Sequence, residues 1–62
     1  MDKEADNLRR RAEMTLGWEE GTSNQFSLIT LRDFVRTKAP KLYYLMTKYI
    51  QSGRYIREDP GA

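Results

Sequence analysis

The sequence predicts a mainly α-helical protein of three short helices. Two observations support this: apolar residues recur at helical spacing in three segments, and a turn signal separates each segment from the next. We expect the helices at about residues 2–16, 30–37 and 40–52, with the last two arranged like a helix-turn-helix. Residues 1–57 would then form a single small domain and residues 58–62 a disordered tail.

The composition excludes several kinds of site. The 62 residues contain no cysteine and no histidine, so disulfides, thiolate metal sites and the usual histidine-based nucleophile arrangements cannot form. The carboxylate pairs at 19–20 and 58–59 lie in segments predicted to be flexible, and the four glycines are too scattered for a phosphate loop. We therefore predict a protein that is not an enzyme and has no cofactor, no metal and no small-molecule substrate.

The length of the chain limits its stability. A core of this size is expected to supply only about 3–5 kcal/mol, so helix packing or self-association has to contribute, and we expect a homodimer. The longest apolar run, residues 42–46, is too short for a membrane span. With no secretory signal at its start, the chain is expected to be intracellular and to have no membrane partner.

The first predicted helix has a thin apolar stripe, made of Met1, Ala5, Leu8, Ala12 and Leu16. Gly17 is placed to supply a left-handed C-terminal cap, and Trp18 follows at the position of the accompanying hydrophobic contact. The arginines at 9–11 are expected to pair within the helix with Asp6 and Glu13 and otherwise to be solvated. The EEGTSNQ segment that follows is a turn-rich loop with no apolar anchor.

The next segment, FSLITLRDF, allows two starts for the second helix. In one, Ser27 is the N-cap; in the other, Thr30 is the N-cap and Asp33 closes a capping box. The hydrophobic staple differs accordingly, being Phe26 with Leu31 in the first case and Ile29 with Phe34 in the second. We favour the second start because it satisfies both halves of the box. It leaves residues 26–29 extended, and these could pair as a short β-strand with residues 54–57.

Pro40 predicts a break between the second and third helices. Proline disfavours the helical conformation of the preceding residue and lacks an N–H donor, yet it is favoured in the first turn of a helix. The alternative is one kinked helix, because a heptad pattern runs straight through the segment at Leu28, Leu31, Val35, Leu42, Leu45 and Tyr49.

The third helix has two distinct faces. Its predicted core face consists of Leu42, Leu45, Met46, Tyr49 and Ile50. The opposite face carries Lys41, Tyr44, Lys48 and Gln51, which can bond a phosphate, a base edge or a carboxylate.

Charge is distributed unevenly along the chain. Residues 1–25 carry four bases and six acids, a net charge of −2, whereas residues 26–57 carry seven bases and one acid, a net charge of +6. Arg32 and Arg36 are one turn apart on an exposed face of the second helix, and Lys38 lies in the turn that follows. Such an asymmetry favours an anionic partner, although a charged helix face can also be merely solvated.

These features predict a small regulatory or accessory protein that binds nucleic acid, with double-stranded DNA preferred to RNA. Phosphate contacts are assigned to Arg32, Arg36 and Lys38, and groove contacts to Lys41, Tyr44, Lys48 and Gln51. The alternative is a protein-interaction or oligomerisation module, whose interface would be formed by Trp18, Tyr43, Tyr44 and Tyr49.

Two motifs, TLRDF and a helix ending in YIQSGRY, flank the tight turn at Pro40. Together they resemble the small helix-turn-helix domain of phage excisionases and their MerR-like relatives, over residues 29–57, about half of the chain. The resemblance implies a DNA-binding or recombination-accessory role. It places Lys41, Tyr44 and Lys48 on the recognition helix and Arg54 at the turn into a wing. The Lys-Ala-Pro turn and the N-terminal acidic helix depart from the family pattern.

Overall fold

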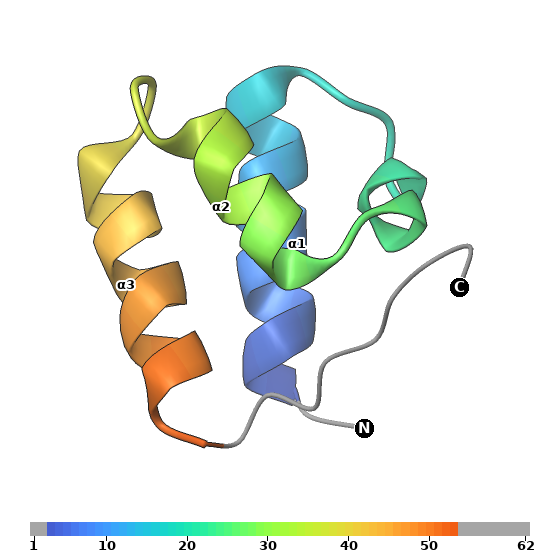
Figure 1. Ribbon diagram of the computed structural model, residues 1–62. Helices are drawn as coiled ribbons and strands as arrows, with labels where there is room; N and C mark the ends of the chain where they lie inside the picture. Colours follow the sequence, from blue (N-terminus) through green and yellow to red (C-terminus); the bar gives the residue numbers. More distant parts are fainter. Residues whose placement is uncertain (1–2, 54–62) are drawn as a thin grey trace.

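The computed structural model describes residues 3–53 and is mainly helical over them. It contains three α-helices and one short 3₁₀-helix: α1 (Lys3–Leu16), η1 (Thr22–Gln25), α2 (Leu28–Val35) and α3 (Pro40–Gln51). Each α-helix contacts the other two, and η1 packs against α1 (Figure 1). No strand occurs between residues 3 and 53. The predicted three-helix class is therefore confirmed.

The end of α1 follows the predicted capping pattern. Gly17 adopts a left-handed conformation with φ of 73°. The Trp18 N–H donates to the Glu13 carbonyl at 2.8 Å, and the Gly17 N–H donates to the Met14 carbonyl at 3.4 Å. These two bonds are those of a Schellman motif, so the local sequence signal at Gly17 was sufficient to locate the helix end.

The second helix starts earlier than predicted. Ser27 is extended and its side chain accepts a hydrogen bond from the Thr30 N–H at 3.2 Å, so Ser27 is the N-cap and the predicted Thr30 start is wrong. Starting at Leu28 places Leu28, Leu31 and Val35 on one fully buried face, which a start at Thr30 would have shortened. Burial of Leu28 against the core therefore outweighs a capping box by Asp33.

The early start also removes the predicted β pairing. Residues 28 and 29 are helical, so the proposed strand at 26–29 is wrong; its partner, 54–57, lies outside the described residues. Phe34, the expected staple partner of Ile29, packs in a cluster of aromatic rings. The centroid distances are 5.4 Å between Trp18 and Phe26, 5.8 Å between Trp18 and Phe34, and 5.4 Å between Phe26 and Phe34.

The break before Pro40 is confirmed, and the single kinked helix is wrong. Residues 36–38 form a turn, and Ala39, the N-cap of α3, leaves the helical region with φ of −142° and ψ of 78°. Pro40 then occupies the first turn of α3, where its missing N–H costs nothing. Figure 1 shows α3 returning alongside α2 after this turn.

All three helices contribute to the core, whose buried members are Leu8, Ala12, Leu28, Leu31, Val35, Leu42, Met46 and Tyr49. The predicted core face of α3 is too wide. Leu45 remains 40% exposed and Ile50 is half-buried. These two residues lie at opposite edges of the five-residue face. Ile50 still packs against the core, whose centre is residues 42, 46 and 49, so the prediction is wrong for Leu45 alone. Within residues 3–53, no helix has the length and apolar character needed to cross a bilayer.

Candidate nucleic-acid interface

The outer face of α3 is exposed as predicted. Its four residues are Lys41, Tyr44, Lys48 and Gln51, and Tyr44 is 58% exposed. The Lys48 ammonium lies 5.4 Å from the centroid of the Tyr44 ring, a cation–π contact across one helical turn. The Tyr44 ring and the Lys48 ammonium are therefore adjacent on the exposed surface of α3.

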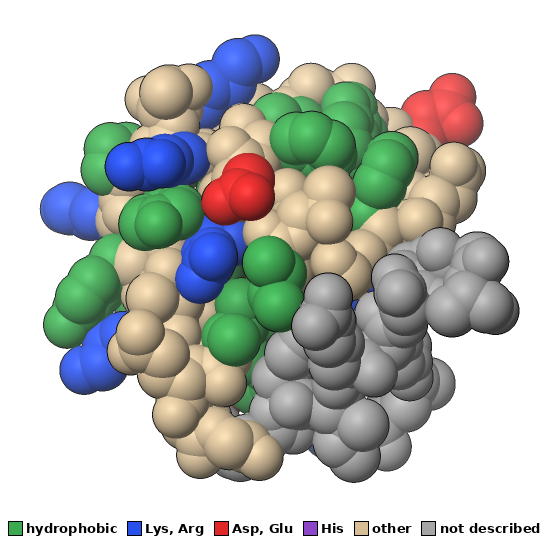
Figure 2. All heavy atoms as spheres, in the orientation of Figure 1, with side chains coloured by type: hydrophobic (Ala, Val, Ile, Leu, Met, Phe, Trp, Pro, Cys, Tyr) green, Lys and Arg blue, Asp and Glu red, His purple; other side chains and the backbone are tan. Residues whose placement is uncertain are grey.

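Basic side chains surround this face. Arg36 and Lys38 are exposed, and Figure 2 shows Lys and Arg side chains gathered over α3 and its junction with α2. Residues 28–51 contain five bases and a single acid, Asp33, whose side chain is 63% exposed. The α2–α3 side of the molecule therefore has a net positive charge with one negative group in it.

Arg32 does not lie on an exposed stripe, and this prediction is wrong. Its side chain is only 22% exposed, because the packing of α2 on α3 places it against the latter helix. Its Nη1 donates to the Thr47 hydroxyl at 3.5 Å, and its Nε is buried without a hydrogen-bond partner among residues 3–53. Among residues 3–53, the acid that pairs with it is Asp33, whose Oδ1 lies 4.0 Å from Nε.

Tyr43 is the residue of this surface that sequence reasoning did not assign to nucleic-acid binding. Its half-buried ring lies 5.4 Å from the Arg32 guanidinium carbon and 5.6 Å from that of Arg36. The signal was present in the sequence as two arginines one turn apart and a tyrosine in the first turn of the next helix. It could be interpreted only once the packing of α3 on α2 was known.

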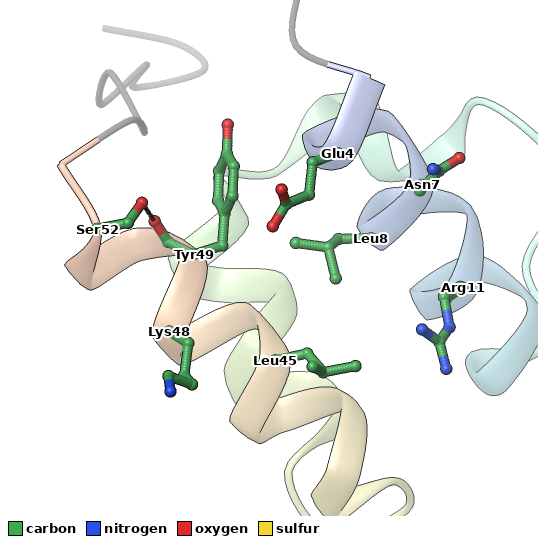
Figure 3. Close-up of a pocket in the computed structure, with 8 residues that line it drawn as sticks. All are labelled: Glu4, Asn7, Leu8, Arg11, Leu45, Lys48, Tyr49 and Ser52. Carbon is green, nitrogen blue, oxygen red and sulfur yellow. Dashed lines mark hydrogen bonds between the residues drawn. The ribbon is translucent and has the colours of Figure 1, made fainter.

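A groove runs between α1 and α3, and Lys48 of the outer face lies at its border (Figure 3). It has a volume of about 470 Å³, and Leu8 of α1 and Leu45 of α3 point into it. Leu45 also borders a shallow apolar hollow of about 400 Å³, together with Pro40, Lys41 and Tyr44. Tyr44, which belongs to the outer face, and its neighbour Leu45 thus form an exposed apolar strip next to Lys41.

The loop between α1 and α2, predicted to have no apolar anchor, is held by polar side chains of α1. Arg9 Nη1 donates to the carbonyls of Ser23 and Phe26, both at 2.8 Å. Glu13 Oε2 accepts from the backbone N–H groups of Gly21 at 2.8 Å and Ser23 at 2.9 Å. The expected intrahelical pairing of Arg9 with Glu13 is replaced by these bonds to the loop.

Glu13 is buried, with 4% of its surface exposed. The hydrogen bonds from Ser23, its backbone N–H above all, lower the pKa of Glu13 below its ordinary value, against the opposing effect of burial. Arg10 Nη2 lies 3.9 Å from Oε1 of the exposed Glu20, and the expected ion pair of Arg10 with Asp6 does not form among the described residues. Arg9 and Glu13 of α1 therefore hold the loop, and they are not part of the outer face of α3.

The aromatic residues of the alternative interface are mostly occupied within the molecule. Tyr49 is only 2% exposed in the core, and Trp18 is half-buried against Phe26 and Phe34. Of the four residues assigned to that interface, Tyr44 is the exposed one. Arg54 lies outside the described residues. Comparison with models of known protein families, with curated proteins and with solved structures found no match.

Proposed function

We propose that the protein binds double-stranded DNA through the outer face of α3, as a small regulatory or accessory protein inside the cell. The observation that carries the proposal is the exposed set Lys41, Tyr44, Lys48 and Gln51 on one rigid helix, flanked by Arg36 and Lys38. A helix of this kind fits the major groove, where polar side chains reach base edges. Basic residues beside it supply the phosphate contacts that determine most of the affinity.

The roles of individual residues follow from their positions. Arg36 and Lys38, at the end of α2 and in the turn, contact phosphates, and the outer face of α3 enters the groove. Arg32 supports this surface from within the α2–α3 contact, and its phosphate contact is limited to its exposed part. The resemblance to excisionase and MerR-like domains supports the same assignment and adds Arg54 as a contact. A homodimer would present two such helices to successive half-sites.

The test is a comparison of two double variants in a fluorescence-anisotropy titration of a mixed-sequence duplex. Lys41→Ala/Lys48→Ala is expected to weaken the Kd roughly tenfold or more and to reduce the salt slope by about two. The control, Lys3→Ala/Arg10→Ala, removes the same charge from exposed positions of α1 and should leave the Kd within about twofold. Equal losses in both pairs would mean that net charge, not the α3 face, determines binding.

A second candidate function is supported by the exposed apolar strip of Tyr44 and Leu45. Such residues, bordered by Lys41 and Lys48, could form a protein-interaction or oligomerisation surface. Tyr44→Ala distinguishes the two functions when oligomeric state is followed by sedimentation. If the surface is an oligomerisation interface, Tyr44→Ala dissociates the oligomer whereas the double lysine variant does not. If it is a DNA-binding surface, Tyr44→Ala weakens DNA binding and leaves the oligomeric state unchanged.

A further inference from the structure

Two arginines contact the same tyrosine ring at the junction of α2 and α3. The guanidinium carbons of Arg32 and Arg36 lie 5.4 Å and 5.6 Å from the centroid of Tyr43. Residues one turn apart on a helix have Cβ atoms only about 5–6 Å from each other. Both cations therefore lie within a small region of surface, and Tyr43 restricts the orientation of each.

The positive charge of this pair is poorly compensated by the described residues. Arg36 is exposed and has no ion pair within residues 3–53, and the one acid near Arg32 approaches only to 4.0 Å. Arg32 donates a single bond, to Thr47 at 3.5 Å, so other donors of its guanidinium have no acceptor within the same residues. Like charges one turn apart on a helix repel each other. An anion placed between them would remove that repulsion.

A phosphate is an anion of the kind that this arrangement can bind. A guanidinium presents a planar fork of donors that matches two oxygens of a phosphate, and a fork already held over an aromatic ring loses less freedom on binding. The C-terminal end of α2 contributes a partial negative charge that favours the arginines themselves. The competing explanation is a purely structural role, in which the two arginines only stabilise the C-terminal end of α2 and contact Tyr43.

We propose that Arg36 and the exposed part of Arg32, oriented by Tyr43, bind one backbone phosphate of the nucleic acid at the α2–α3 junction. In this site Tyr43 is a positioning residue, and Asp33 is a negative group that weakens binding. The inference rests on the proposed function, because the phosphate is taken to be that of a DNA strand lying along α3. It goes beyond that function by assigning both arginines to one shared phosphate, a contact that is independent of base sequence and that fixes the position of α3 on the duplex.

The site can be tested without DNA, by titrating the ¹⁵N-labelled protein with inorganic phosphate and observing the arginine Nε–Hε signals in NMR spectra. Sodium chloride at the same ionic strength is the reference. We expect saturable shifts for Arg32 and Arg36 with phosphate alone, while Arg10 and Arg11, exposed on α1, stay unchanged. A small and equal drift of all four signals would contradict the site.

The second test uses the duplex. Arg36→Gln is expected to weaken the Kd roughly tenfold and to lower the salt slope by about one, whereas Arg10→Gln changes neither. Asp33→Asn should strengthen binding severalfold, because it removes the one acid from this surface. An Arg36→Gln variant that binds as well as Arg10→Gln would overturn the site.

The role of Tyr43 is measured by its coupling to Arg36. Tyr43→Phe keeps the ring and should retain affinity, whereas Tyr43→Leu should weaken binding. The double variant Tyr43→Leu/Arg36→Gln should bind no worse than Arg36→Gln, since the tyrosine acts through that arginine. Additive losses in folded variants would assign Tyr43 a structural role and contradict positioning.

The two proposals fail in different ways. Phosphate shifts at Arg32 and Arg36 without duplex binding would support the anion site and refute the DNA-binding function. Duplex binding that depends on Lys41 and Lys48 but not on Arg36 would support the function and refute the site.

Discussion

At the scale of single residues, Glu13 and Arg9 determine the path of the loop between α1 and α2. Glu13 accepts from two loop amides and Arg9 donates to two loop carbonyls, all within 2.9 Å. Ser23, one of the residues they hold, is 1% exposed, so its backbone groups have little access to water. Side chains of α1 therefore replace the solvent as partners of this loop.

Glu13→Ala is expected to destabilise the protein by about 2–3 kcal/mol. The change removes the acceptor of the Gly21 and Ser23 N–H groups. Gly21 is exposed and can turn to water, but the Ser23 N–H is buried, and an unsatisfied buried donor is costly. The measurement is urea unfolding followed by circular dichroism. Glu20→Ala, at an exposed position of the same region, serves as the control and should change stability by less than about 0.5 kcal/mol. If the two variants lose the same amount of unfolding free energy, the hydrogen bonds of Glu13 to the loop do not contribute specifically to stability.

The same carboxylate makes stability depend on pH. Folding lowers the pKa of Glu13 below its ordinary value of 4.5, chiefly through the Ser23 N–H. The charged form is thus favoured in the folded state, and its contribution is complete above about pH 4.5 and is lost as pH falls through the lowered pKa. The stability difference between wild type and Glu13→Gln should therefore shrink on acidification from pH 7 to pH 3. A difference that stays constant over that range would exclude Glu13 as the titrating group.

At the scale of helices, local signals predicted what local chemistry determines. The Gly17 cap and the break at Pro40 depend on residues adjacent in sequence, and both were located correctly. The start of α2 was not, because two caps one turn apart are locally equivalent and the burial of Leu28 decides between them. The anchored loop could not be predicted either, since Arg9 and its loop partners are 14 and 17 residues apart.

The candidate site was also predictable only in part: the parts that depend on one helix were predicted, and those that depend on helix packing were not. Periodicity identified the exposed face of α3, because that face depends only on which side of one helix meets the core. The half-buried position of Arg32 and its contact with Tyr43 depend on how two helices pack. Leu45 was misassigned for the same reason: periodicity gives the centre of a buried face more reliably than its edges.

Met46→Ala and Leu45→Ala test the packing of α3. Met46 is fully buried, and its truncation is expected to cost about 2–4 kcal/mol, whereas Leu45, at 40% exposed, should cost less than about 1 kcal/mol. Both are measured by urea unfolding. Equal costs would mean that Leu45 is covered in solution, either by another protomer or by a different packing of α1 on α3.

At the scale of the whole molecule, the net positive charge lies on α2 and α3, whereas residues 1–25 are net negative. Residues 1–25 contain six of the nine acids and have a net charge of −2; they also contain Arg9 and Glu13, which hold the loop. The exposed basic residues described above belong to α2, α3 and the turn between them. A duplex approaching the protein would be attracted to one side and repelled by the other. Such an asymmetry orients the encounter and makes the association rate fall as ionic strength rises.

The measurement that tests the central claim most directly is the salt dependence of duplex binding by the wild-type protein. Four exposed basic side chains at this surface, Arg36, Lys38, Lys41 and Lys48, would each neutralise about one phosphate charge of the duplex, whether they contact the backbone or lie in the groove, which predicts a slope of log affinity against log salt of about −3.6. A slope of that size or steeper, with saturable binding, would support α3 and its basic neighbours as a DNA-binding surface. No binding at low salt, or a slope near zero, would contradict it.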